Sequence, residues 1–277
     1  MSREYVYETS NKDIIRITTF GNDNFDKKKC LFFVHGFKGF KDWGFGPYLG
    51  KYLADKGFFV VTFNFSHNGV GENFTEFTEL EKFAENTISL EIAELSELIA
   101  AYEKGFFGNT KVNKIGVIGH SRGGGVSILN AVNNNSIDAL CTWSAVSTFD
   151  RYTDRQKTEW KQKGFFEALN SRTNQMMRMN LSYLEDVEKN KNSSLDFASA
   201  SHNLKIPWLI IHGEQDLAVP VDEAKKLYAW SQKDSTDFMI VPSTGHTFDI
   251  THPFQGSNSK FERVLDVTSK FFSHKLK

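Results

Sequence analysis

The chain has 277 residues, of which 40% are hydrophobic, so it is long enough and apolar enough to bury a globular core. Its 33 basic and 34 acidic residues leave a net charge of -1, which gives no overall attraction toward nucleic acid or an anionic membrane. Cys30 and Cys141 are not spaced as a pair, and no leader segment or apolar run of about 18 residues is evident. We therefore expect a soluble, cytoplasmic protein without a disulfide framework.

The amino-terminal segment alternates apolar and polar residues in EYVYET and DIIRITTF, which predicts an antiparallel hairpin at a sheet edge. Six short apolar runs follow, each of a length typical of a strand buried on both faces. They are CLFFVHG at 30–36, FFVVTFNF at 58–65, KIGVIGH at 114–120, ALCTWSAV at 139–146, PWLIIHG at 207–213 and DFMIVP at 237–242.

Segments whose apolar residues have helical spacing separate most of these runs. Apolar residues three and four apart predict a long helix over residues 75–105, and we interpret its acidic positions from Glu81 to Glu97 as a solvated face. Shorter helices are predicted over residues 122–132, 221–230 and 259–275. Alternating strands and helices indicate right-handed crossovers and a mostly parallel sheet with helices on both faces.

Residues 147–206 form an insertion that is longer than a single crossover helix requires. The segments EWKQKGFFEALN and NQMMRMN predict a short hairpin or a helical excursion about Asn170 and Ser171. SYLEDVEKNKNSS, which follows, is typical of a solvated helix that continues into a loop. We expect a small cap over the carboxyl edge of the sheet, inserted into a single domain that spans residues 1–277.

In open α/β sheets, ligands bind beyond the carboxyl ends of the strands, so the residues after each apolar run are candidates for chemistry. The run KIGVI precedes a G-x-S-x-G frame at residues 119–123, in which a sharp strand-to-helix turn exposes a strained serine. The turn also places the Arg122 backbone N–H at a helix N-terminus, where it can stabilise an oxyanion. The frame also occurs by chance, so the partners of Ser121 decide whether it is a nucleophile.

A serine nucleophile needs a base that takes its proton and a third group that orients the base. Asp216 follows the run PWLIIHG and His246 follows the run DFMIVP, so nucleophile, acid and base appear in the chain order Ser121, Asp216, His246. Phe37, in the loop after the run CLFFVHG, supplies a second backbone N–H for an oxyanion.

Other residues compete for two of these roles. Glu214 or Asp150 could orient the histidine instead of Asp216. Three histidines compete with His246, which alone follows the last predicted strand directly after a glycine. These competitors are His67, His202 and His252, of which His252 is expected to line the site or to pack. His35 and His212 precede glycines at strand ends, and we interpret them as histidines that hydrogen-bond their own loops.

Taken together, these motifs resemble those of serine α/β-hydrolases, in particular compact esterases and dienelactone-hydrolase-like or prolyl-oligopeptidase-like members. The resemblance rests on HGFKG, GHSRGG, HGEQDLAVP and GHTFDITHPF, and it extends from Cys30 to the last predicted helix. It implies the α/β-hydrolase fold and hydrolysis through an acyl-serine intermediate. The dienelactone hydrolases themselves have a cysteine where this chain has Ser121, which argues against a dienelactone substrate.

These motifs predict a serine esterase for small carboxylic esters. His246 would take the Ser121 proton, Asp216 would orient the imidazole, and the Phe37 and Arg122 amides would bind the oxyanion. The reaction needs no cofactor. An aminopeptidase or thioesterase with the same residues is an alternative, as is a ligand-binding protein on a hydrolase scaffold.

Aromatic and methionine side chains near the expected site are candidates for substrate contacts, although such clusters more often belong to a core. We assign this role to Trp43, Trp160, Phe165, Met176 and His252. No metal is expected, because the eight histidines lack the spacing of a metal-binding motif. The insertion is too charged for a lipase lid, so short, soluble acyl groups are expected.

Overall fold

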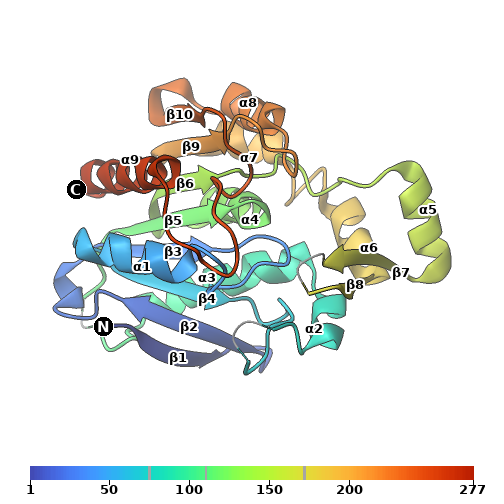
Figure 1. The fold of residues 1–277 in the computed structure, drawn as a ribbon, viewed down its shortest axis with the longest axis horizontal. Coiled ribbons are helices and arrows are strands. Elements are labelled where there is room, and N and C mark those ends of the chain that lie inside the picture. The colour runs from blue at the N-terminus through green and yellow to red at the C-terminus, as the bar shows by residue number, and fades with distance from the viewer. Residues whose placement is uncertain (74–75, 110, 171–172) are drawn as a thin grey trace.

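The computed structural model describes residues 1–73, 76–109, 111–170 and 173–277. An eight-stranded sheet runs through the molecule with helices on both faces (Figure 1). Its strands follow the order β1-β2-β4-β3-β5-β6-β9-β10, and all neighbours from β4 onward in this order are parallel. The prediction of a mostly parallel sheet is confirmed.

The strands match the predicted runs. β1 (Arg3–Glu8) and β2 (Ile14–Phe20) form the predicted antiparallel hairpin at one edge, and β2 also pairs with β4 in antiparallel orientation. The parallel strands are β3 (Cys30–Val34), β4 (Phe59–Asn64), β5 (Ile115–His120), β6 (Ile137–Trp143), β9 (Trp208–Gly213) and β10 (Thr236–Val241). β10 is partly exposed, unlike the fully buried strand that we predicted, because it ends the sheet.

Two hydrophobic clusters cover the two faces of the sheet. α1 (Gly46–Asp55) and α9 (Ser259–Lys275) pack on one face. α3 (Ile88–Glu103), α4 (Arg122–Ala131), α7 (Phe197–Asn203) and α8 (Val221–Trp230) pack on the other. The single-turn helices η1 (Phe25–Lys27) and η2 (Lys233–Ser235) lie in connecting loops.

The long helix predicted over residues 75–105 is wrong in one respect, because it is divided into α2 (Leu80–Glu85) and α3. Residue 75, where that prediction begins, lies outside the described residues. The division occurs because the Thr87 side chain accepts a hydrogen bond from the Leu90 N–H and thereby starts a new helix. The interpretation of its acidic positions as a solvated face is wrong for Glu91 and Glu94, which are buried, whereas Glu81 and Glu85 are exposed.

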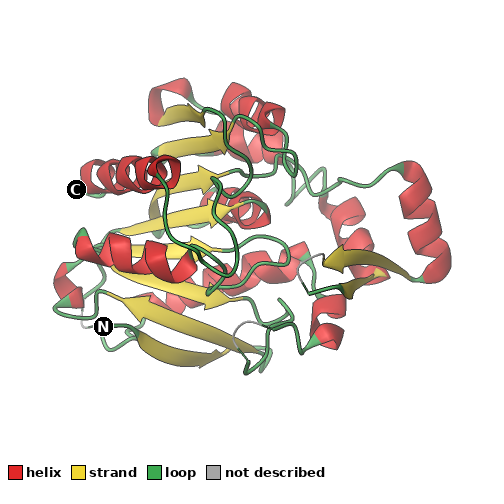
Figure 2. Ribbon diagram, in the orientation of Figure 1, coloured by secondary structure: helices red, strands yellow, loops and turns green. Residues whose placement is uncertain are grey.

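The insertion contains α5 (Asp154–Lys163), the hairpin strands β7 (Phe165–Asn170) and β8 (Gln175–Asn180), α6 (Leu181–Asn190) and α7. Figure 2 shows the β7–β8 hairpin apart from the main sheet, beyond the carboxyl ends of its strands. Its turn was predicted at Asn170 and Ser171, but Ser171 lies outside the described residues. α6 is the predicted helix, although Tyr183 and Leu184 on it are buried.

The strand register brings several loops to one edge of the sheet. Strand ends are matched by the pairs Val34 with Gly119, His120 with Trp143, Trp143 with Ile211, and Val241 with Gly213. The loops after β3, β5, β6, β9 and β10 therefore leave the sheet side by side. The predicted nucleophile, acid and base (Ser121, Asp216 and His246) and the oxyanion candidates Phe37 and Arg122 lie in these loops or at their ends.

Candidate functional site

Ser121 occupies a strained turn between β5 and α4. Its backbone has φ 58° and ψ −121°, which is unfavourable for a residue with a side chain. Hydrogen bonds to the chain around the end of β6 hold the turn: the Ser121 N–H donates to Trp143 O at 2.9 Å, and Val146 N–H donates to Ser121 O at 3.3 Å. The predicted strand-turn-helix geometry is therefore present.

Two glycines let the loop after β3 lie directly against this turn. A Cβ atom on Gly36 would lie 2.8 Å from Ser121 Cβ, and one on Gly123 would lie 2.3 Å from His35 O. This close approach brings the backbone around Phe37 to Ser121, and both residues line the same cavities.

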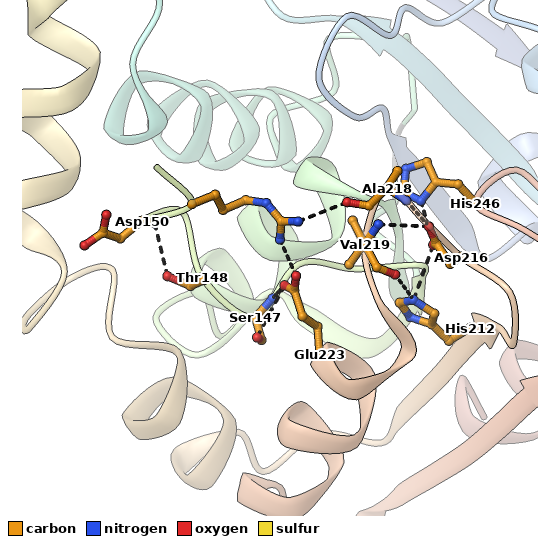
Figure 3. Close-up of polar contacts among 10 residues, drawn as sticks. Ser147, Thr148, Asp150, His212, Asp216, Ala218, Val219, Glu223 and His246 are labelled. Carbon is orange, nitrogen blue, oxygen red and sulfur yellow. Dashed lines mark hydrogen bonds and ion pairs between the residues drawn. The ribbon is translucent and has the colours of Figure 1, made fainter. Parts of the chain in front are cut away.

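His246 and Asp216 are joined by a short hydrogen bond between His246 Nδ1 and Asp216 Oδ2, at 2.7 Å (Figure 3). The other carboxylate oxygen, Asp216 Oδ1, accepts the backbone N–H groups of Ala218 and Val219 at 2.9 and 2.8 Å. Burial opposes ionisation of Asp216, but hydrogen bonds from His212 and His246 and the charge of His246 outweigh it and lower its pKa well below the usual value. The pair thus leaves His246 Nε2 available for another proton.

The two alternative acids have other partners. Asp150 pairs with Lys157 and Lys191, and Figure 3 shows its carboxylate pointing away from His246. Burial would raise the pKa of Asp150, but hydrogen bonds from these lysines and their charges lower it. Glu214 Oε2 accepts the Ser243 N–H at 2.9 Å and so ties together the loops after β9 and β10.

His35 and His212 hydrogen-bond their own loops, as predicted. His212 Nε2 lies 2.8 Å from Val219 O and 3.3 Å from Asp216 Oδ2. It therefore also braces the loop after β9 that carries Asp216, which we call the acid loop. His35 Nδ1 lies 3.0 Å from Gly36 O, and burial lowers the pKa of His35 to about 4. A neutral His35 therefore fixes the loop that carries Phe37.

The competing histidines lie elsewhere. His67 Nδ1 is 2.6 Å from Ser66 Oγ, and His202 belongs to α7. His252 Nδ1 accepts the Gly44 N–H at 3.0 Å, and its ring stacks on Trp43 with the ring centres 6.0 Å apart. His252 therefore supports the loop around Trp43.

Two cavities meet at Ser121 and His246. The smaller, of about 90 Å³, lies toward the aromatic side of the loop after β3 and includes Trp43 and His120 in its wall. The larger, of about 430 Å³, lies toward the insertion. Its wall consists of the insertion, the turn after β5 and the acid loop: Phe37, Lys38, Ser121, Arg122, Val146, Phe149, Arg151, Tyr152, Tyr183, Ala218, Val219 and His246.

Of the five predicted substrate contacts, Trp43 lines the smaller cavity, and the other four, including His252, lie outside both walls. Trp160 is buried behind Tyr183, with the two rings nearly parallel and their centres 5.9 Å apart. Phe165 packs under the Arg178 guanidinium at 4.5 Å, and Met176 is 50% exposed. The insertion contributes Tyr152 and Tyr183 to the wall instead. Tyr152 was among the aromatic residues of the insertion that the sequence offered for such a pocket, whereas Tyr183 was missed.

Arg122 joins three elements at the larger cavity. Its guanidinium lies 4.0 Å from the centre of the Phe37 ring, 3.4 Å from Glu91 on α3, and 3.4 Å from the Tyr183 hydroxyl. Burial raises the pKa of Glu91, although the charge of Arg122 opposes the shift. Sequence analysis missed Glu91 because it lies among other acidic residues of the same helix.

One group of described side chains could hold a metal ion. Ligand atoms of Asp13, His67 and Glu94 lie within 4.8 Å of one another. Sequence spacing did not reveal this group, since its members come from three distant segments. Ser66 hydrogen-bonds both His67 and Glu94, and its N–H donates to Glu94 Oε2 at 3.0 Å, so His67 and Glu94 already have partners without an ion.

The model of the prolyl oligopeptidase family matches residues 43–277 of this chain. No curated protein matches the chain. Among the helices of the described residues, none is long and apolar enough to cross a membrane.

Solved structures similar to this chain include a putative hydrolase from Agrobacterium vitis, with 16% identity over 98% of both chains and a TM-score of 0.75. Est1E from Butyrivibrio proteoclasticus, with ferulic acid bound, has 17% identity over 98% of this chain and 99% of its own, with a TM-score of 0.76. A dienelactone hydrolase from Anabaena variabilis has 16% identity over 100% and 99%, with a TM-score of 0.63. The fold is therefore the α/β-hydrolase fold that the sequence motifs predicted.

Proposed function

We propose that this chain, which belongs to the prolyl oligopeptidase family, is a serine hydrolase that cleaves a small carboxylic ester through an acyl-Ser121 intermediate. The observation that carries the proposal is the 2.7 Å hydrogen bond between His246 Nδ1 and Asp216, at a cavity that also contains Ser121. A histidine held in this way by a buried carboxylate is suited to remove a proton from a nearby hydroxyl. In this proposal Ser121, His246 and Asp216 form a catalytic triad.

Acylation begins when Ser121 Oγ attacks the ester carbonyl carbon and its proton passes to His246 Nε2. The carbonyl oxygen becomes an oxyanion, which the Phe37 and Arg122 N–H groups would stabilise. Neither N–H is used in a hydrogen bond within the described part of the chain. The intermediate then breaks its bond to the alcohol oxygen, which leaves with the proton from His246.

Deacylation repeats these steps with water as the nucleophile. His246 takes a proton from water, the resulting hydroxyl attacks the acyl carbon, and the same N–H groups stabilise the second oxyanion. Collapse releases the carboxylic acid and returns the proton to Ser121 Oγ. Asp216 remains ionised throughout, as its lowered pKa favours, and stabilises the imidazolium.

Amide cleavage is the second candidate activity, and the family match favours it. The proposed triad defines acyl transfer but leaves the leaving group open, so a thioester is a third possibility. The larger cavity and the bound ferulic acid of Est1E support including an aromatic ester among the tests. A panel of p-nitrophenyl esters, a feruloyl ester, aminoacyl anilides and acyl thioesters under identical conditions would rank these substrates.

Labelling with a fluorophosphonate tests the proposal directly, because only an activated hydroxyl attacks phosphorus at a useful rate. We expect one adduct, located at Ser121 by peptide mapping, with loss of esterase activity in proportion to labelling. Heat-unfolded protein is the control and should not react. An adduct at another serine, or esterase activity that survives complete labelling, would remove the proposed nucleophile. The absence of both labelling and turnover would favour a ligand-binding protein.

A further inference from the structure

The larger cavity has a positively charged wall. Lys38, Arg122 and Arg151 line it, and no aspartate or glutamate is found among the wall residues that the structure describes. Glu91 and Glu223, which pair with the two arginines, are not part of the wall. The two acids therefore pair with the arginines without lining the cavity themselves.

Arg151 is the wall cation best placed to contact a substrate. Its Nη1 pairs with Glu223, and its Nη2 donates to Ala218 O at 3.0 Å. Glu223 Oε2 also accepts the Ser147 N–H at 2.7 Å, so this carboxylate links the start of the insertion to α8 (Figure 3). The guanidinium is therefore held in one orientation before any ligand arrives.

The guanidinium of Arg151 has donors to spare. A guanidinium carries five N–H groups, and the bonds to Glu223 and Ala218 engage its two terminal nitrogens once each within the described residues. The side chain is 31% exposed, and the residue lines the cavity. A planar donor group with a fixed orientation is suited to bind a carboxylate through paired hydrogen bonds.

The other two cations add charge at the cavity. Arg122 is enclosed by Phe37 and Tyr183, with only 9% of its side chain exposed. Lys38 reaches from the loop after β3 to the insertion, where its Nζ donates to Leu169 O at 2.9 Å. Aromatic and aliphatic side chains form most of the remaining wall, which lowers the local dielectric and strengthens attraction for an anion.

We propose that the part of the substrate in the larger cavity carries a carboxylate, and that Arg151 is the residue that binds it. The substrate class is then esters with a second, free carboxylate, such as half-esters of short dicarboxylic acids. A cavity of about 430 Å³ accepts a chain of this size. This inference rests on the proposed ester hydrolysis at Ser121.

Paired esters that differ in one charge test the inference. The acyl-side pair is mono-p-nitrophenyl glutarate and p-nitrophenyl valerate, and the alcohol-side pair is 4-carboxyphenyl butyrate and 4-carbamoylphenyl butyrate. For each pair, the ratio of kcat/KM for the anionic to the neutral ester is measured after subtraction of spontaneous hydrolysis. In one of the pairs, Arg151→Gln should lower this ratio about tenfold, the typical effect of losing one charge-assisted hydrogen bond. The pair that responds identifies the side of the ester that carries the carboxylate.

Arg155→Gln is the matched control. Arg155 lies on α5 of the same insertion, 88% of its side chain is exposed, and it pairs with Glu159 rather than lining the cavity. The Arg155→Gln variant should leave both ratios unchanged. Arg151→Lys should give a ratio between those of the wild type and Arg151→Gln. Loosening of the acid loop through Ala218 would slow both esters of a pair equally and so would not move the ratio. Equal ratios in wild type, Arg151→Gln and Arg155→Gln would overturn the inference.

A binding measurement separates this inference from the proposed reaction. Monomethyl glutarate is titrated into Ser121→Ala and into the Ser121→Ala, Arg151→Gln double variant, with ligand-observed NMR as the readout. We expect about tenfold weaker binding by the double variant, and weaker binding by Ser121→Ala at high salt. Failure of ester hydrolysis alone would leave this difference intact. Equal binding by the two proteins would contradict the role of Arg151 whatever the reaction.

Discussion

The loops at the carboxyl edge of the sheet and the insertion over them differ in how they are held. At the edge, backbone hydrogen bonds fix the turn at Ser121, and backbone N–H groups fix the carboxylate of Asp216. In the insertion, ion pairs such as that of Lys161 with Glu188 lie at the surface, and the hairpin exposes Leu169 and Met176. Since surface ion pairs contribute little to stability, the edge is expected to be rigid and the insertion adaptable.

In the proposed mechanism, the edge carries out catalysis and the insertion sets substrate preference. The edge supplies every group of the proposed triad and both oxyanion donors, while the insertion supplies Arg151, Tyr152 and Tyr183 to the larger cavity. Arg122 connects the two regions, because its backbone belongs to the edge and its side chain contacts Tyr183. Changes at the edge should therefore abolish turnover, whereas changes in the insertion should alter which substrate is preferred.

The largest expected effect is at the edge. Ser121→Ala and His246→Ala should each lower kcat on an activated ester by about 10⁴-fold or more, because the two groups act as one unit. The double variant should be little slower than either single variant. Steady-state kinetics with p-nitrophenyl acetate, together with circular dichroism to confirm folding, measures this. Multiplicative losses in the double variant would argue against a shared mechanism.

Asp216→Asn should lower kcat by about 10³-fold, since an amide cannot favour the same histidine tautomer or stabilise the imidazolium. Asp150→Asn, in the insertion, and Glu214→Gln, at the edge, should lower it less than tenfold, because neither side chain bonds His246. The three variants are compared on one ester. A larger loss at Asp150 than at Asp216 would transfer the acid to the insertion.

The two regions were not equally predictable from sequence. The edge was predictable because each short apolar run forms one strand, and aligned parallel strands bring the residues after them together. The position of Ser121, Asp216 and His246 at this edge could be predicted from the local pattern and from their order in the chain. The contacts of Trp160 and Met176 depend on how the insertion folds back, and Glu91 is distinguished from its acidic neighbours by burial alone. Long-range packing carries no local signal of this kind.

Asp150 in the insertion and Glu94 on α3, which packs on one face of the sheet, should respond to pH in opposite directions. Burial raises the pKa of Glu94 to about 7 in the folded protein, despite hydrogen bonds from Ser66. The folded state thus holds this proton more tightly than the unfolded state, so the stabilisation is complete below about pH 4.5 and is lost as pH rises through 7. Asp150, with a lowered pKa, instead contributes stability above its unfolded value of about 3.9 and loses it as pH falls.

Glu94→Gln should therefore reduce the loss of unfolding free energy between pH 5 and pH 8 by about 2 kcal/mol, an amount that allows for partial relaxation of the buried group. Asp150→Asn should leave the difference between these two pH values unchanged, because Asp150 does not titrate there. Urea unfolding of wild type and both variants at the two pH values provides the numbers. An unchanged pH dependence in Glu94→Gln would show that Glu94 stays ionised in the folded protein.

The smallest effect is expected at the exposed hairpin of the insertion. Met176 on β8 pairs with Leu169 on β7, and both side chains are 50% exposed. Met176→Ser should change the free energy of unfolding by less than about 0.5 kcal/mol and leave the preference among acetyl, butyryl and octanoyl p-nitrophenyl esters unaltered. Tyr152→Ala is the comparison variant and should shift the preference toward longer acyl chains. Tyr152 lines the larger cavity, so its removal would open space there. A shift in chain-length preference with Met176→Ser would mean that the hairpin closes over the substrate. The part of the insertion that sets substrate preference would then include β8 as well as the wall of the larger cavity.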